Sequence, residues 1–116
     1  MNNLYSETRK DKYGNKLLSD EAFKIGYEAA KNYLDEMLKF HNFGKLKASN
    51  VFVFFMTNII SEKLTELDIF DATYEDFNQI IGAVTGEEID TSKDWWNCWN
   101  GKKYTGYIPK SLDVNA

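Results

Sequence analysis

The longest apolar run of the chain, Val51–Met56, opens a segment whose next eleven residues alternate between apolar and polar positions with a helical period. A buried strand over the run itself is the alternative, because β-branched and aromatic residues also suit a pleated strand. With Val53 and Phe54 included, the first turn and a half is apolar on every side, so we expect other elements to enclose it. The pattern predicts a central helix over Val51–Leu67 with one apolar face: Phe52, Phe55, Met56, Ile59, Ile60, Leu64 and Leu67.

Two further amphipathic helices are predicted on either side of the central one. The first begins after Ser19, a typical N-cap residue, and ends near residues 42–44. The other begins at Thr73, with Asp76 in the position of a capping-box acid, and ends at Gly86. Short connectors between such helices favour antiparallel neighbours around one core. Their apolar stripes contain Phe23, Gly26, Tyr27, Ala30, Tyr33, Leu34, Met37, Leu38 and His41, and then Tyr74, Phe77, Ile80, Ile81 and Val84.

The two ends of the chain carry weaker patterns. Residues 1–18 contain a turn signal at Tyr13-Gly14-Asn15, which predicts either a small hairpin or a partly ordered arm. The Trp-rich segment after residue 90 fits a short helix followed by an extended tail to Pro109, which we favour. The alternative is a hairpin that turns at Asn100-Gly101 and pairs the tryptophans with residues 102–104.

These patterns together predict a mainly α protein. We expect a compact bundle of about three principal helices, with the Trp-rich C-terminal segment covering one end of it. Residues 1–18 form the arm or hairpin, and residues 19–116 form a single helical domain. A chain of 116 residues is long enough to bury one core, and a hydrophobic fraction of 43% argues against disorder.

Candidate chemistry is sparse in this sequence. The only histidine, His41, and the only cysteine, Cys98, stand in no catalytic motif, and no paired ligands for a metal are visible. No glycine-rich phosphate loop is present either. We therefore expect no enzymatic activity, no metal and no cofactor. The start of the chain lacks a signal-peptide pattern, and no apolar run is long enough to span a bilayer. We therefore expect a cytoplasmic protein that does not associate with a membrane.

The charge distribution is more informative than the motifs. Residues 62–90 contain nine acids and one base, Lys63, whereas residues 93–110 carry four lysines and one acid. A solvated helix surface is the simple explanation, and an acidic surface for a basic partner is the alternative. The nine acids of this candidate surface are Glu62, Glu66, Asp68, Asp71, Glu75, Asp76, Glu87, Glu88 and Asp90.

An aromatic cluster follows in the C-terminal segment, with Lys102 and Lys103 among its members. Such rings can cap a core, anchor a protein interface or stack on nucleotide bases, and all three interpretations stay open. The cluster contains Trp95, Trp96, Trp99, Tyr104 and Tyr107.

These properties favour a non-enzymatic protein-binding module whose partner is basic or binds nucleic acid. An inhibitor from a phage or mobile element, of the anti-restriction or anti-CRISPR type, has this character, and so does an immunity protein against a basic toxin. A binder of small ligands or single-stranded nucleic acid through the aromatic cluster is the third hypothesis, and self-association stays open. A net charge of −4 and a single arginine, Arg9, disfavour direct nucleic-acid binding.

Overall fold

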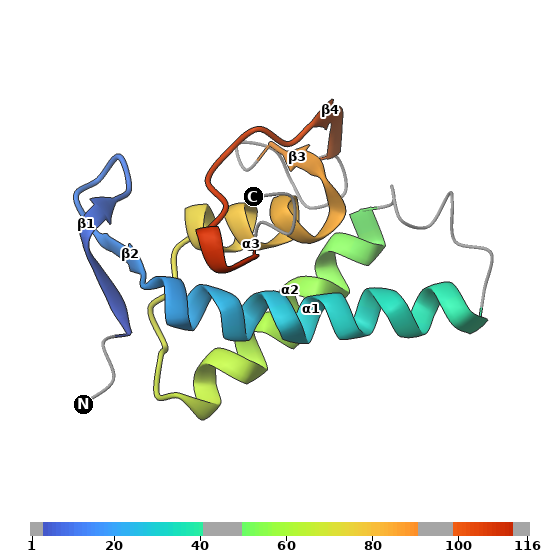
Figure 1. Cartoon of the computed structure of the whole chain (residues 1–116), viewed down its shortest axis with the longest axis horizontal. Helices are drawn as coiled ribbons and strands as arrows, with labels where there is room; N and C mark the ends of the chain where they lie inside the picture. Colours follow the sequence, from blue (N-terminus) through green and yellow to red (C-terminus); the bar gives the residue numbers. More distant parts are fainter. Residues whose placement is uncertain (1–3, 41–49, 91–98, 113–116) are drawn as a thin grey trace.

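The structure of the chain is a computed structural model, and it describes residues 4–40, 50–90 and 99–112. Helices make up most of these residues. Three α-helices lie within these ranges, and two small antiparallel sheets flank them (Figure 1). The prediction of a mainly α protein is thereby confirmed. The elements are β1 (Tyr5–Lys10), β2 (Lys16–Leu18), α1 (Asp20–Phe40), α2 (Asn50–Glu66), α3 (Tyr74–Thr85), β3 (Glu87–Ile89), β4 (Trp99–Lys103) and the 3-10 helix η2 (Lys110–Leu112).

The helix boundaries agree with the predicted caps. The Ser19 hydroxyl accepts a hydrogen bond from the backbone N–H of Ala22 at 3.2 Å, so Ser19 caps α1. Thr73 and Asp76 form a complete capping box at the start of α3, and Gly86 ends that helix with a φ of 78°. The predicted end of α1 at residues 42–44 lies outside the described residues.

The apolar run at 51–56 belongs to a helix rather than a strand, as predicted. The expected enclosure of its first turn and a half is wrong, however, because Phe54 and Phe55 are 49% and 47% exposed. The physical reason is the direction in which α2 packs. Its buried side is centred on Met56 and Ile60, which turns Phe54 and Phe55 toward the solvent side of the helix.

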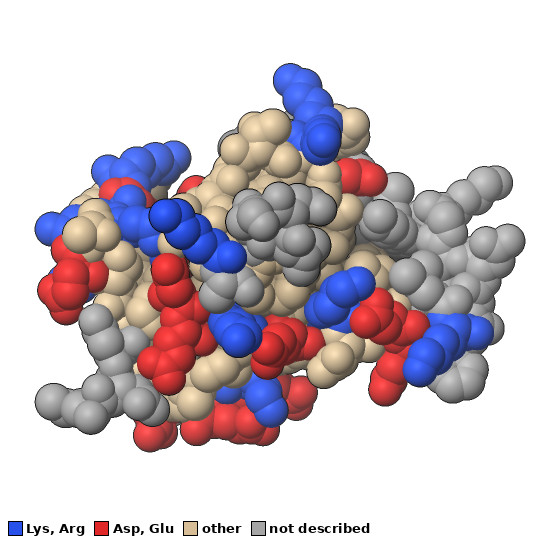
Figure 2. Space-filling view, viewed as in Figure 1, with Lys and Arg blue, Asp and Glu red and all other residues tan. Residues whose placement is uncertain are grey.

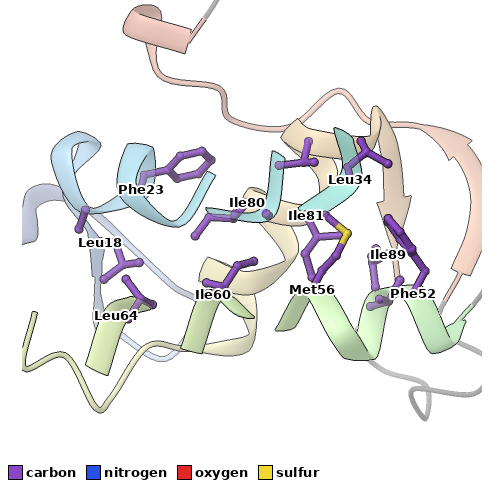
Figure 3. Close-up of a cluster of buried hydrophobic side chains, with 14 of the residues drawn as sticks. Leu18, Phe23, Leu34, Phe52, Met56, Ile60, Leu64, Ile80, Ile81 and Ile89 are labelled. Carbon is purple, nitrogen blue, oxygen red and sulfur yellow. The ribbon is translucent and has the colours of Figure 1, made fainter. Parts of the chain in front are cut away.

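One continuous core joins the three helices (Figure 3). It extends from Leu18 and Leu64 at one end to Phe52 and Ile89 at the other (Figure 3). Helix α1 packs against both α2 and α3. At Gly26 it lies close to α3, because an added Cβ there would lie 3.0 Å from Ile80 Cδ1. The stripe glycine is therefore the residue that lets α1 and α3 pack closely.

The N-terminal segment is a hairpin, the first of the two predicted alternatives. Asp11 organises its turn by accepting hydrogen bonds from the backbone N–H groups of Tyr13 and Asn15, both at 2.9 Å. Leu17 and Leu18 of β2 are buried, and Leu18 belongs to the core. The hairpin is therefore fastened to the helices through its second strand.

Of the two arrangements predicted for the C-terminal segment, the hairpin turn is contradicted, and the short helix lies largely outside the described residues. Residues 91–98 lie outside the described residues, but residues 99–103 form β4, which pairs with β3. Asn100-Gly101 thus lies within a strand, and the predicted hairpin turn at this dipeptide is wrong. The register shifts there: Gly101 has a φ of 74° and the Asn100 side chain accepts from the N–H of Lys102. An Asn-Gly pair suits such a bulge as well as a turn, because both require a positive φ.

The prediction that Asp76 belongs to an acidic surface is wrong. The Asp76 side chain is buried, with a relative exposure of 2%. One carboxylate oxygen accepts from the backbone N–H of Leu18 at 2.9 Å, and the other accepts from the N–H and hydroxyl of Thr73. Desolvation raises the pKa of Asp76, and these hydrogen bonds lower it in part. The carboxylate thus caps α3 and also ties β2 to it.

We expect Asp76→Ala to lower the free energy of unfolding by about 2–4 kcal/mol, because the donors of Leu18 and Thr73 lose their shared acceptor inside the protein. Urea unfolding followed by circular dichroism measures this. Glu62→Ala removes an exposed carboxylate from α2 and serves as the control, with a change below about 0.5 kcal/mol. An Asp76→Ala protein as stable as the parent would contradict the role of this carboxylate.

Candidate protein-binding surface

The predicted acids do not share one surface. Asp76 is buried, as described above, and Asp68, with a φ of 61°, is exposed just beyond the end of α2. Glu62 and Glu66 line a shallow depression on the solvent side of α2. The remaining acids lie at the start of α3 or on β3 and just after it: Asp71, Glu75, Glu87, Glu88 and Asp90. Four of these five line two other grooves, and Glu87 lines neither.

The first of these is the hairpin groove, which lies between the turn of the N-terminal hairpin and the start of α3. In Figure 1 the hairpin stands beside the yellow connection that leads into α3. The volume of the groove is about 870 Å³. Ala72 and Phe77 give it apolar surface. Its lining residues are Asp11, Lys12, Tyr13, Asn15, Asp71, Ala72, Thr73, Tyr74, Glu75 and Phe77.

The walls of the hairpin groove are held in place by hydrogen bonds between segments that are distant in the sequence. The hydroxyl of Tyr5 donates to Asp71 Oδ1 at 2.5 Å, which links β1 to the connection before α3. The hydrogen bond with the Asp71 carboxylate, together with desolvation, raises the pKa of Tyr5 to about 12. Asp11 holds the turn on the opposite side. Both walls are therefore ordered before anything binds.

Exposed aromatic rings surround this groove. Tyr13 and Tyr74 are 77% and 67% exposed and line it, and Phe70, just before Asp71, is 75% exposed. Large exposed rings on an ordered surface are typical of protein interfaces. The Nζ of Lys12 lies 5.2 Å from the centroid of the Tyr13 ring. One of these rings thus already contacts an ammonium group within the chain.

The second is the α3–β3 groove, bounded by α3, the second sheet and residues 104–107. Its volume is about 440 Å³, and it is lined by the carboxylates of Glu75, Glu88 and Asp90. Glu75 lines both grooves, so they adjoin each other along α3. Glu75 accepts from Gln79 Nε2 at 3.0 Å, and Glu88 accepts from Asn100 Nδ2 at 3.1 Å. These amide donors fix the carboxylates without neutralising them.

The distribution of basic groups complements these acids. Figure 2 shows Lys and Arg side chains over the hairpin and at the tip of β4, and acidic side chains mixed with further basic ones across the lower part of this view. Of the basic residues on the hairpin, only Lys12 lines the hairpin groove. Among the described residues, none that lines the α3–β3 groove is basic. Across both grooves, the lining groups are one lysine and the carboxylates of Asp11, Asp71, Glu75, Glu88 and Asp90.

The predicted aromatic cluster is only partly described. Trp95 and Trp96 lie outside the described residues, and of Trp99 only its place at the start of β4 is described. Tyr104 is 9% exposed, and its ring lies where Cβ atoms on Gly82 and Gly106 would clash. The two glycines let its ring pack largely inside the fold, but Tyr104 also lines the α3–β3 groove, so its role as an interaction residue stays a prediction.

Tyr107 is half-buried and serves the fold in another way. Its ring lies 3.9 Å from the guanidinium carbon of Arg9, its edge meets Phe23, and its hydroxyl donates to Asp20. Burial and the hydrogen bond to Asp20 raise the pKa of Tyr107. These contacts join the C-terminal segment to the hairpin and α1. Its ring edge also lines the α3–β3 groove.

Sequence reasoning missed the exposed rings of the hairpin groove. The apolar stripe predicted for the third helix includes Tyr74, and the sequence pattern predicts Tyr13 only as part of a turn. A signal did exist at Phe70, an apolar residue between Asp68 and Asp71 that continues no helical stripe. The groove itself depends on how the hairpin docks, which no local pattern encodes.

The described ranges contain neither a cluster of metal ligands nor a membrane-spanning helix. No group of three or more potential metal ligands comes together there. None of the described helices combines the length and apolarity required to cross a bilayer. His41 and Cys98 lie in segments that are not described.

Comparison of the chain with family models, with curated proteins and with solved structures found no match. The candidate surface is therefore interpreted from its own geometry.

The link between Tyr5 and Asp71 predicts a pH dependence. Because the fold raises the pKa of Tyr5 from 10.0 to about 12, the folded protein holds this proton more tightly than the unfolded chain. The stability that the link contributes is present below pH 10 and is lost as the pH rises toward 12. Asp71→Ala should move the Tyr5 pKa toward 10, as measured by NMR titration of its ring carbons.

Glu62→Ala, which removes an equal charge from α2, should leave that titration unchanged. A Tyr5 pKa that is the same in the parent and in Asp71→Ala would contradict the link between β1 and the start of α3.

Proposed function

We propose that this protein is a non-enzymatic protein-binding module that recognises a basic partner protein through the two grooves along α3. The observation that supports this most directly is the combination of carboxylates and exposed rings. Among the described residues, five carboxylates and one lysine line the adjoining grooves, and the exposed rings of Tyr13 and Tyr74 line one of them. Phe70, also exposed, directly precedes the lining residue Asp71.

Each part of this combination has a physical role in association. The negatively charged carboxylates attract a basic surface over about 8 Å at physiological ionic strength, which raises the association rate. They also repel acidic proteins. The exposed rings supply apolar contact area that resists dissociation once the surfaces meet. Charge alone would give a weak and salt-sensitive complex, and rings alone would give little selectivity. Both are present at the hairpin groove.

A host protein that handles nucleic acid is the partner class that we propose. Its phosphate-binding surface is basic, so an acidic module can occupy it and exclude the nucleic acid. The chain would then act in the cytoplasm as an inhibitor from a phage or mobile element, of the anti-restriction or anti-CRISPR type. An immunity protein against a basic toxin would use the same surface, and the identity of the captured protein separates these two.

Binding of single-stranded nucleic acid through the C-terminal aromatic residues has less support. Tyr104 is packed inside the fold. The ring of Tyr107 stacks on the Arg9 guanidinium, and its hydroxyl donates to Asp20. Lys102 and Lys103 of β4 are exposed, but phosphates placed in the neighbouring α3–β3 groove would meet its three carboxylates.

Affinity capture from lysate of the native host, with two matched triple variants, tests the proposal. The groove variant combines Glu75→Gln, Glu88→Gln and Asp90→Asn. The control variant combines Glu62→Gln, Asp68→Asn and Glu66→Gln, which removes the same charge from the region of α2. Amide replacements keep the size and the hydrogen-bonding capacity of each side chain.

We expect the parent protein to capture one basic protein that binds nucleic acid or acts as a toxin, more strongly at low salt than at moderate salt. Its affinity should fall at least tenfold in the groove variant and less than twofold in the control variant, as measured by titration calorimetry with the purified partner. Equal losses in both variants would mean that the net charge matters and not the grooves. An acidic partner, or binding that is unaffected by the groove variant, would contradict the proposal.

A further inference from the structure

From the hairpin groove we infer a more specific mode of recognition, which rests on the proposed function: this groove receives a short basic segment of the partner and holds a lysine or arginine side chain of that segment. The inference concerns the groove lined by residues 11–15 and 71–77. The two grooves share Glu75, but Tyr13 lines the hairpin groove and not the α3–β3 groove, so the Tyr13 variants test the hairpin groove separately.

The size and lining of the groove suit a peptide segment with a long aliphatic side chain. Its volume of about 870 Å³ exceeds that of any single side chain, and the groove is partly open to solvent. Ala72, Phe77 and the rings of Tyr13 and Tyr74 provide apolar surface. The methylene groups of lysine or arginine can be buried against such surface while the charged end reaches carboxylates at the rim.

The charges at the rim select a cation. The carboxylates of Asp11, Asp71 and Glu75 line the groove together with one basic residue, Lys12. Lys12 itself lies over the Tyr13 ring, where its ammonium is 5.2 Å from the centroid. An incoming lysine or arginine can make the same kind of contact with an exposed ring and pair with a carboxylate as well. A phosphate or an acidic peptide would be repelled by three carboxylates at close range.

The rigidity of both walls favours binding by a short segment. The hairpin turn is closed by Asp11, and Tyr5 ties β1 to Asp71. Little conformational entropy is therefore lost on the side of this protein when the groove is filled. The groove residues Tyr13 and Glu75 take no part in the core, so substitution there leaves the fold in place.

The test uses the full chain and two probes, acetyl-Ala-Lys-Ala-Lys-Ala-amide and the same peptide with arginine in place of lysine. Acetyl-lysine at both positions gives the control peptide, which keeps the length of the side chain and removes its charge. Binding is followed by two-dimensional 15N NMR. We expect shifts at residues 11–15 and 72–77 with one or both cationic peptides, and no saturable shifts with the control peptide.

Four variants sharpen the assignment. Tyr13→Ala should weaken peptide binding at least fivefold, and Tyr13→Phe, which keeps the ring, should stay within twofold of the parent. Glu75→Gln should weaken binding at least threefold and reduce its salt dependence, whereas Glu62→Gln should have no effect. An unchanged NMR spectrum outside the groove shows that each variant is folded.

Several results would overturn the inference. These are no binding of either cationic peptide, equal binding of the acetylated control, or shifts confined to the α3–β3 groove or to Phe54 and Phe55. Self-association that protects the hairpin groove, seen as a concentration-dependent mass, would assign the groove to a second copy instead. If the groove variant loses partner capture and the peptide titration fails, the proposed function stands and only this mode of recognition is rejected.

Discussion

The buried carboxylate of Asp76 is the interaction on which the candidate surface depends. It closes the capping box of α3 through Thr73 and accepts the backbone N–H of Leu18 from the end of the hairpin. A desolvated carboxylate is costly unless its oxygens are hydrogen-bonded, and here both oxygens are. The Asp76 carboxylate both caps the start of α3 and binds the backbone of β2. It therefore holds the hairpin next to the start of α3, where the hairpin forms one wall of the groove.

Arg9, the only arginine in the sequence, completes this arrangement from the opposite side. Its guanidinium donates to the carbonyl oxygen of Leu18 and to Gln79 Oε1 of α3, and it stacks on the ring of Tyr107. A planar group with five donors can join a strand, a helix and the C-terminal segment at once, which lysine cannot. Arg9, Leu18 and Asp76, which hold the hairpin against α3, do not line the hairpin groove, whereas Asp71 both lines it and binds Tyr5. This separation lets the groove carry carboxylates and exposed rings without a loss of core packing.

Much of the helical framework could be predicted because local chemistry determines it. Ser19 and the Thr73–Asp76 pair cap helices, and the period of the apolar residues sets the buried side of α3. Asp76 shows where this reasoning ends: a capping acid looks like any surface acid until the chain that buries it is known. Asn100-Gly101 fits a turn and a bulge equally well, and only the pairing of β4 with β3 decides between them. The direction of Phe54 likewise depends on how α2 packs, and the candidate surface depends on the docked hairpin.

The central claim is that a partner binds along α3 between the hairpin and β3. Amide hydrogen exchange of the full chain, alone and in complex with the captured partner, tests it most directly. We predict that the complex slows exchange at residues 11–15, 71–77 and 87–90 and leaves the solvent side of α2 unchanged. Protection confined to the first turns of α2 around Phe54 and Phe55, or to its depression at Glu62 and Glu66, would contradict the account and place the binding surface on α2.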